Sequence, residues 1–232
     1  MKTGTVFIIS APSGSGKTTL TNRLLSLVPG LQFSISYTTR EPRGSEESGR
    51  EYFFITPGKF ESMIESGEFL EYAKVFGNYY GTAKHFLDDA TRAGKDLVLD
   101  IDVQGAHQVK TKMPEAVSIF ILPPSREVLE RRLRGRSQAE NVTSQEVIRR
   151  RLEEAAREIE KYPNYDYILV NDQLEESIDH LQAIVLAERS KRRKDASIDG
   201  ETLAKADALR LANVRQRAKQ IFESFGLAPA PQ

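Results

Sequence analysis

Ser10-Ala11-Pro12-Ser13-Gly14-Ser15-Gly16-Lys17-Thr18-Thr19 follows the apolar run 6–9 and opens a helical pattern of leucines. The stretch predicts a strand, a tight turn and a helix in direct succession. Such a turn presents backbone N–H groups and the positive end of a helix dipole to a polyphosphate, and its glycines let the backbone approach closely. We therefore expect Lys17 to reach the β- and γ-phosphates of a bound polyphosphate and the Thr18 hydroxyl to bind Mg²⁺.

The first position of this loop departs from the strict pattern, which has Gly where this chain has Ala11. That position shapes the turn and donates no charge, so we interpret Ala11 as a tolerated variant. The alternative is a Gly/Ser-rich loop that only joins a strand to a helix. The apolar strand before the loop and the Lys-Thr-Thr sequence behind it argue against that alternative.

The composition indicates a globular chain. With 232 residues, 39% of them hydrophobic and 28% charged, it can form one core of about 150 to 200 residues and carry an appendage. No apolar run approaches the roughly 18 residues of a membrane span, and the lack of cysteine suits a reducing compartment. We therefore expect a cytoplasmic protein without a membrane partner. Its histidines, His85, His107 and His180, show no metal-ligand spacing.

Charge is unevenly distributed along the chain. Residues 189–232 hold ten Lys or Arg and five Asp or Glu, a net charge of +5, which leaves −5 on the first 188 residues. The basic residues are not interleaved with aromatic side chains that could stack on bases, so we expect no nucleic-acid partner.

A polar, arginine-containing loop, 38–52, lies between short strand patterns. Strands are predicted at 32–37, 52–55 and 69–75, a helix at 57–66, a turn at 78–82 and a helix at about 83–93. The guanidinium groups of Arg40 and Arg43 match phosphate oxygens in bidentate fashion, which favours a phosphate-binding loop. A flexible basic loop is the alternative.

Carboxylates end the next predicted strand, 96–103, whose apolar run is typical of a central parallel strand. In phosphate-loop folds a carboxylate at the C-terminal end of such a strand lies beside the phosphates and holds Mg²⁺, often through water, and Asp100 is our candidate. The alternative is a structural role as a helix N-cap, which fits Asp102 better by position.

Arginines are dense after a further apolar strand at 116–122. Two predicted helices with a polar tip, 126–157, could form a lid that closes arginines over phosphates, or could be solvated helices balanced by glutamates. A last strand, 165–172, and a helix, 174–188, complete the core.

The final segment, 189–232, has apolar residues at helical spacing between 211 and 225 and predicts an amphipathic helix ended by Gly226. This apolar stripe must be covered by the chain's own core or by another subunit. A monomer and a homo-oligomer therefore both stay open, with the subunit contact favoured.

Six motifs, in order and at family spacing, resemble those of guanylate kinase. They are Ala11-Pro-Ser-Gly-Ser-Gly-Lys-Thr18, Thr38-Thr-Arg-Glu-Pro-Arg43, Gly49-Arg-Glu-Tyr-Phe-Phe54, Gly77-Asn-Tyr-Tyr-Gly81, Asp100-Ile-Asp-Val-Gln-Gly105 and Val170-Asn-Asp172. The resemblance covers about residues 4–188 and implies an α/β fold, with a phosphate-loop core whose central parallel sheet is flanked by helices. Within it, the core comprises 4–35, 84–125 and 158–188, the small mixed α/β GMP-binding insert 36–83 and the helical lid 126–157. The basic extension, 189–232, lies outside the resemblance.

The resemblance also implies the site residues. The GMP phosphate is expected among Ser36, Arg40, Arg43, Tyr52 and Tyr80, and the guanine edge at Glu71, Thr82 and Asp102. Thr82 stands where the family often has Ser and keeps the hydroxyl. ATP is expected at Ala11, Pro12, Ser13, Gly14, Ser15, Gly16, Lys17, Thr18, Thr19 and, for its adenine, Asn171. The expected catalytic residues are Lys17, Arg40 and the lid arginines Arg132, Arg136 and Arg151.

The activity that the resemblance implies is transfer of a phosphoryl group from ATP to GMP, and to dGMP, with Mg²⁺, as a step of purine nucleotide metabolism and GMP recycling. Guanine offers two donors, N1–H and the 2-amine, which carboxylates can accept, whereas adenine has an acceptor at N1, so AMP should be rejected. Two alternatives stay open. One is a catalytically silent guanylate-kinase-like module that binds protein partners, and the other is a kinase for another small phosphorylated substrate.

Overall fold

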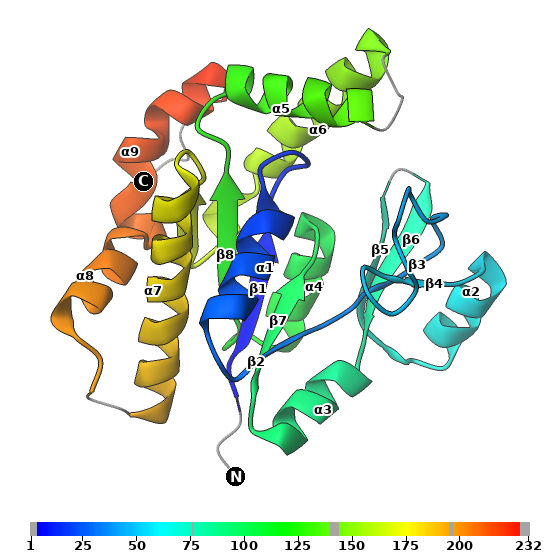
Figure 1. The fold of residues 1–232 in the computed structure, drawn as a ribbon, viewed down its shortest axis with the longest axis horizontal. Coiled ribbons are helices and arrows are strands. Elements are labelled where there is room, and N and C mark those ends of the chain that lie inside the picture. Colours follow the sequence, from blue (N-terminus) through cyan, green and yellow to red (C-terminus); the bar gives the residue numbers. More distant parts are fainter. Residues whose placement is uncertain (1–3, 76, 140–143, 195–196, 228–232) are drawn as a thin grey trace. The chain divides into compact units, whose positions relative to one another are not determined.

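The computed structural model describes residues 4–75, 77–139, 144–194 and 197–227. The chain divides into two compact units, the first made of 1–8 and 29–116 and the second of 9–28 and 117–232. Strand β1 (Val6–Ser10) contributes to both units. Among the described residues a five-stranded sheet has the order β2-β7-β1-β8-β9, and a four-stranded sheet has the order β4-β3-β6-β5 (Figure 1).

The first unit contains the whole four-stranded sheet. Its strands are β3 (Tyr37–Thr38), β4 (Phe53–Phe54), β5 (Phe69–Val75) and β6 (Asn78–Ala83). The sheet is mixed, because β3 pairs parallel with β4 and antiparallel with β6, which also pairs antiparallel with β5. Phe60 of helix α2 (Pro57–Glu65) stacks on Phe69, with ring centroids 4.4 Å apart, and so closes one face of this sheet.

The rest of the first unit consists of the parallel strands β2 (Leu31–Phe33) and β7 (Asp96–Asp100) and the helices α3 (His85–Ala93) and α4 (Val103–Lys112). Gly94 ends α3 with a φ of 61°, a left-handed conformation that glycine adopts without strain. Asp102 caps α4, since its Oδ1 accepts a hydrogen bond from the Gly105 N–H at 2.9 Å. The N-cap role predicted for position 102 is confirmed.

Two local predictions in this unit are wrong. Residues 32–37 do not form one strand, because β2 ends at Phe33 and β3 begins at Tyr37 in the other sheet. Residues 78–82 are not a turn but part of β6, where each residue faces a partner on β5 or β3. Tertiary pairing decides both, since Asn and Gly otherwise favour turns.

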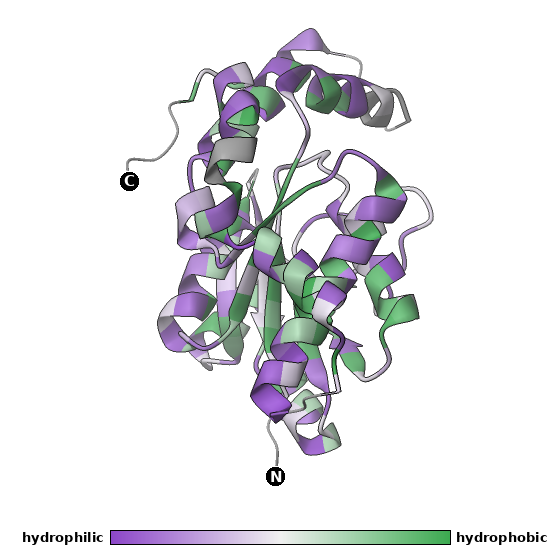
Figure 2. Ribbon diagram, turned by 90° about the vertical axis from the view of Figure 1, so that its left-hand side faces the viewer, coloured by the Kyte–Doolittle hydropathy of each residue, from purple (hydrophilic) through white to green (hydrophobic). Residues whose placement is uncertain are grey.

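In the second unit the strands β8 (Val117–Leu122) and β9 (Tyr167–Val170) pair in parallel, with Ile119 opposite Tyr167. Every residue of β8 is buried. The helices are α1 (Lys17–Leu27), α5 (Arg126–Ala139), α6 (Gln145–Ile159) and α7 (Leu174–Arg193), with the short helix η1 (Tyr162–Asn164) before β9. Figure 2 shows mainly apolar strands and helices that mix polar and apolar residues, as amphipathic helices do.

The C-terminal extension forms α8 (Gly200–Ala208), which the sequence did not predict, and α9 (Leu211–Ser224). Between these helices the chain adds to the edge of β9, where the Ile168 N–H donates to Leu209 O at 2.9 Å and the Leu211 N–H donates to Asp166 O at 3.1 Å. The α9 stripe is buried within the same chain, with at most 7% exposure at Val214, Ala218, Ile221, Phe222 and Phe225. The expected subunit contact through this stripe is therefore wrong, because the chain's own core covers it.

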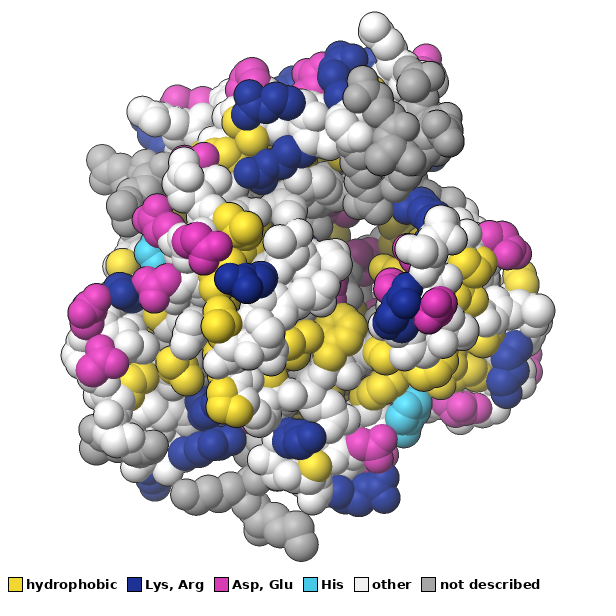
Figure 3. All heavy atoms as spheres, in the orientation of Figure 1, with side chains coloured by type: hydrophobic (Ala, Val, Ile, Leu, Met, Phe, Trp, Pro, Cys, Tyr) yellow, Lys and Arg dark blue, Asp and Glu magenta, His cyan; other side chains and the backbone are white. Residues whose placement is uncertain are grey.

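The surface carries charges of both signs. On the face shown in Figure 3 the basic and acidic side chains are dispersed in small groups, as the zero net charge of the sequence suggests. Within the described ranges, no helix combines the length and the apolar character needed to cross a membrane.

Candidate active site

The phosphate loop connects the fully buried strand β1 to α1, as the sequence predicts. Gly14 and Gly16 have φ values of 88° and 90°, which residues with a Cβ atom rarely adopt. The loop also turns on itself, since the Ser15 N–H donates to Pro12 O at 3.1 Å. Helix α1 begins at Lys17, so the N–H groups of its first turn and its positive dipole end lie at the loop.

Asn171 fixes this loop from the end of β9. Its Nδ2 donates to Ser15 O at 2.7 Å, and its side chain is so close that a Cβ at position 16 would lie 2.3 Å from the same nitrogen. Only glycine fits there. The adenine contact that the resemblance implies for Asn171 stays a prediction, and the structure adds a second role, which is to hold the loop in shape.

Arg132 of α5 contacts Asn171, the residue that holds the loop. Its Nη2 donates to Asn171 O at 3.1 Å, while its buried Nη1 has no hydrogen-bond partner among the described residues. Burial lowers the pKa of Arg132, and the charge of Asp172 acts in the opposite direction. A buried donor without a partner costs free energy, so Nη1 is suited to an anionic ligand. The side chain of Arg136, further along α5, lies outside the described residues; Arg151 is half-buried on α6.

The first unit brings together the residues expected to read guanine. Glu71 and Thr82 are cross-strand partners on β5 and β6, with 3% and 0% exposure. A Cβ on Gly105 would lie 2.3 Å from Oε2 of Glu71 and 3.3 Å from Oδ1 of Asp102, so both carboxylates meet at this glycine. Polar side chains that converge from a strand and a helix terminus are suited to reading a donor-rich ring edge.

Glu71 is the most perturbed acid of this group. Burial, together with the charge of Asp102, raises its pKa to about 7, although hydrogen bonding with Thr82 and the charge of Lys112 act in the opposite direction. A buried carboxylate so poorly compensated gains from ligand N–H donors.

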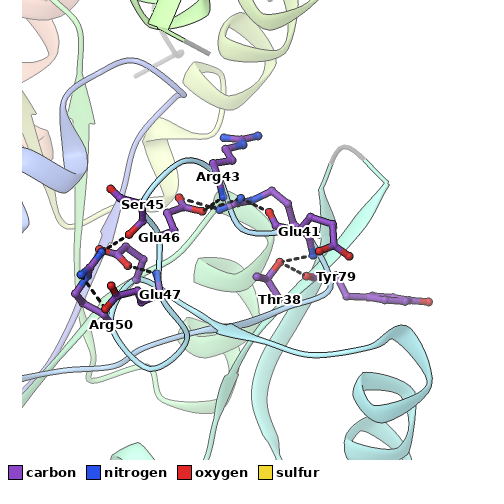
Figure 4. A network of polar contacts seen from close by, with 10 residues as sticks. Thr38, Glu41, Arg43, Ser45, Glu46, Glu47, Arg50 and Tyr79 are labelled. Atoms are coloured by element: carbon purple, nitrogen blue, oxygen red, sulfur yellow. Dashed lines mark hydrogen bonds and ion pairs between the residues drawn. The ribbon is translucent and has the colours of Figure 1, made fainter. Parts of the chain in front are cut away.

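A second cluster in the same unit gathers the residues expected at the GMP phosphate. The Arg40 guanidinium lies over the Tyr52 ring, 5.3 Å from its centroid, and the Tyr52 and Tyr80 rings meet edge to face at 5.9 Å. Ser36 is buried, and Arg43 is exposed with its guanidinium extended away from Glu46 (Figure 4). Arg40, Tyr52 and Tyr80, three of the residues predicted at the phosphate, therefore contact one another.

Glu46 contacts both arginines of this cluster, and the sequence analysis did not single it out. Its carboxylate forms an ion pair with Nη1 of Arg40 at 2.9 Å and accepts from Nη2 at 3.1 Å and from the Arg43 N–H at 2.8 Å (Figure 4). Burial acts to lower the pKa of Arg40, but the hydrogen bond and charge of Glu46 outweigh it and raise that pKa. The three-residue spacing from Arg43 to Glu46, closed by a turn, was the signal that could have identified this pair.

The third arginine of the loop has a different environment. Arg50 pairs with Glu47 at 3.0 Å and with Glu51 at 2.6 Å, and about half of its side chain is exposed. Figure 4 shows Arg50 with its acidic partners at the other end of this network from Arg43.

The residues expected at Mg²⁺ are oxygen donors. Asp100 is the last residue of β7, and Thr18 is exposed in the first turn of α1. Among the described residues no group of three or more His, Cys, Asp or Glu could hold a metal ion by itself. Each side chain is of the kind that Mg²⁺ takes, since this ion usually binds one or two protein oxygens together with phosphates and water.

Comparison with known proteins agrees with this geometry. The guanylate kinase family model matches residues 3–188. The chain is similar to guanylate kinase of Koribacter versatilis, with 57% identity over 232 residues and 99% of both chains. It is 47% identical to guanylate kinase of Escherichia coli K12 over 205 residues, 85% of this chain and 97% of that protein.

A solved structure gives the same result. The crystal structure of guanylate kinase from Anaplasma phagocytophilum matches with a TM-score of 0.69 and 33% identity, over 90% of this chain and 98% of that chain. Sequence and fold thus agree with the phosphate loop and the carboxylate-lined site described above, and on these grounds the chain belongs to the guanylate kinase family.

Proposed function

We propose that this chain catalyses ATP + GMP ⇌ ADP + GDP and is an ATP:GMP phosphotransferase. The observation that supports it most directly is the buried Glu71 carboxylate, which meets Asp102 at Gly105. Guanine would supply N1–H and 2-amine donors to these carboxylates, in addition to the contacts that they already make with Thr82, Gln104 and Gly105. AMP would leave at least one buried carboxylate unsatisfied, and such losses discriminate strongly between ligands.

The GMP phosphate would be held by Arg40, Arg43, Tyr52 and Tyr80, with Ser36 beside them. Glu46 would keep Arg40 in one rotamer, since its carboxylate contacts both terminal nitrogens of the guanidinium, Nη1 and Nη2. A guanidinium that is already oriented loses less entropy when the phosphate arrives.

The ATP phosphates would lie on the loop from Ala11 to Thr19, with Lys17 at the β- and γ-phosphates and Asn171 holding the loop. Arg132, Arg136 and Arg151 would add positive charge from the 126–157 lid. The buried Nη1 of Arg132 supports this assignment, since it lacks a partner among the described residues. Mg²⁺, held by Thr18 and, through water, by Asp100, would neutralise charge on the β- and γ-phosphate oxygens when bound.

In the reaction a GMP phosphate oxygen would form a bond to the γ-phosphorus of ATP. The bond from that phosphorus to the β–γ bridging oxygen would break, and ADP would leave with this oxygen. The attacking oxygen is already anionic, so no general base is needed. The protein's part is positioning and charge neutralisation by Lys17, Arg40 and the lid arginines. Closure of the lid and of the GMP-binding insert, 36–83, would exclude water, which competes as the acceptor.

We further propose that the enzyme works in the cytoplasm and accepts dGMP, because none of the assigned contacts involves the ribose 2′-hydroxyl. GDP formation would place it in purine nucleotide metabolism and GMP recycling. Oligomeric state is open, since the buried α9 stripe no longer requires a partner.

A coupled assay of ADP formation with GMP, dGMP, AMP and UMP tests the proposal. We expect GMP to be preferred strongly, with dGMP second. Lys17→Ala, purified in the same way, controls for a contaminating kinase. No nucleotide-dependent ADP formation would favour the catalytically silent module, and preference for another nucleotide would favour the other kinase.

A further inference from the structure

Helix α9 of the C-terminal extension contacts the start of α5 and the short helix η1 that follows α6. We propose that α9 braces the two hinges of the lid, and that Ser224 and Phe222 are positioning residues for ATP binding. This inference rests on the proposed role of residues 126–157 as a lid. The family model ends at residue 188, so α9 lies outside the domain that defines the family.

The first contact is at the start of the lid. The first N–H groups of a helix have no partner within that helix. In α5, Ser125 Oγ accepts the Val128 N–H at 3.3 Å, whereas the Arg126 N–H donates to Ser224 Oγ of α9 at 3.1 Å. Ser224 Oγ in turn donates to Ile221 O at 2.7 Å, which fixes its rotamer. The entry into the lid is therefore bonded to the last turn of α9.

The second contact is where the chain leaves the lid. Helix α6 ends at Ile159, and Tyr162 follows in η1. The Tyr162 ring stacks on Phe222 of α9, with centroids 4.2 Å apart and an interplanar angle of 19°. Both are buried, with 4% and 0% exposure, so the contact adds apolar burial to the ring stacking.

Helix α9 is itself anchored at its other end. Arg210 precedes α9, and its Nη2 donates to Glu188 Oε1 at 3.0 Å. The same carboxylate oxygen accepts the Tyr167 hydroxyl at 2.6 Å, and the Arg210 guanidinium lies 4.9 Å from the centre of the Tyr167 ring. With the backbone bridge between Tyr167 and Arg210, this fixes the start of α9 on β9.

These contacts connect the core to the lid through one helix. Both hinges of the lid touch the same turn, Phe222–Ser224, of a helix whose first residue is fixed on the sheet. Helix α5 also carries Arg132, whose Nη2 reaches Asn171 beside the phosphate loop. A small rotation of α5 about its start would therefore move this arginine relative to the ATP phosphates.

The test uses three variants of the full-length chain. Ser224→Ala removes the acceptor for the Arg126 N–H, and Phe222→Leu keeps an apolar side chain but removes the stacking. Gln220→Ala, at an exposed position of the same helix, is the matched control. We expect Ser224→Ala and Phe222→Leu to raise the KM for ATP by about two- to tenfold, the size of one lost hydrogen bond or ring contact. The KM for GMP should stay at the wild-type value, and ATP hydrolysis without GMP should rise relative to GDP formation.

Binding of a non-hydrolysable ATP analogue, measured by calorimetry, separates this inference from the proposed function, because it needs no GMP-dependent activity. A wild-type protein without GMP kinase activity would refute the proposed function, and the variants' affinity for the analogue would still test the brace. Wild-type KM and Kd values in a folded Ser224→Ala protein would overturn the brace. Equal changes for ATP and GMP, or a lower Tm with unchanged kinetics, would also overturn it, because α9 would then act on stability alone.

Discussion

Replacing Glu71 by Gln should make the free protein more stable while weakening GMP binding. The side chain is 3% exposed, and burial raises its pKa from 4.5 to about 7. A carboxyl whose pKa is higher in the folded than in the unfolded state destabilises the fold when it is ionised. Glutamine has nearly the same shape and carries no charge, so it removes that cost.

The size of the effect follows from the two pKa values. At about 1.4 kcal/mol per pH unit, their difference corresponds to a cost of about 3 kcal/mol. The cost is absent below the unfolded value, grows as pH rises toward 7 and is constant above it. Glu71→Gln should therefore raise the free energy of unfolding by about 3 kcal/mol at pH 8 and by about 1 kcal/mol at pH 5.5.

Urea unfolding at both pH values measures this difference. Glu61→Gln is the control, because it makes the same change of charge at an exposed position of α2 and should leave stability unchanged. A Glu71→Gln protein no more stable than wild type at pH 8 would refute the argument, since the buried carboxylate would then carry no cost.

Although Glu71→Gln should stabilise the fold, it should weaken GMP binding. Guanine donors need the ionised carboxylate, so with a pKa of about 7 the wild-type KM for GMP should rise about tenfold from pH 8 to pH 6. Glu71→Gln should raise the KM at pH 8 by about ten- to a hundredfold and narrow the preference for GMP over AMP. The GMP phosphate also titrates near pH 6 and affects both proteins equally. The quantity to follow is therefore the KM for GMP of Glu71→Gln divided by that of the wild type, because this ratio cancels the contribution of the phosphate. A ratio that does not vary with pH would show that Glu71 does not accept from the base.

Three further variants test the rest of the site. Lys17→Ala removes the charge expected at the β- and γ-phosphates and should lower kcat by several orders of magnitude with an unchanged Tm; near-normal turnover would refute the phosphate-loop assignment. Glu46→Gln weakens the pair that orients Arg40 and should raise the KM for GMP about tenfold without affecting the KM for ATP, which steady-state kinetics can verify. Gly16→Ala would place a Cβ 2.3 Å from Asn171 and should abolish ATP binding in calorimetry. Gly94→Ala, which also lies at a positive φ but has no atom within 4 Å of its Cβ, should bind ATP normally.

The sequence by itself determined the fold class and the family. The phosphate loop and the buried strands are local patterns, because a strand buried on both faces is a continuous apolar run and a tight loop needs glycine at fixed positions. The same holds for the cap at Asp102 and the stop at Gly94, each of which depends on a few neighbouring residues. Most of the candidate site residues came from the resemblance to the family rather than from such local patterns.

Only the tertiary structure decided how distant segments pair. Residues 32–37 alternate like one strand but divide between two sheets, and residues 78–82 have turn composition but pair along β5. The hydrogen bond from Asn171 to Ser15 was equally hidden, and only the structure decided that α9 packs on the chain's own core. The physical reason is that hydrogen bonding across a sheet and burial of an apolar stripe depend on which surfaces meet, and one stretch of sequence holds only one of those surfaces.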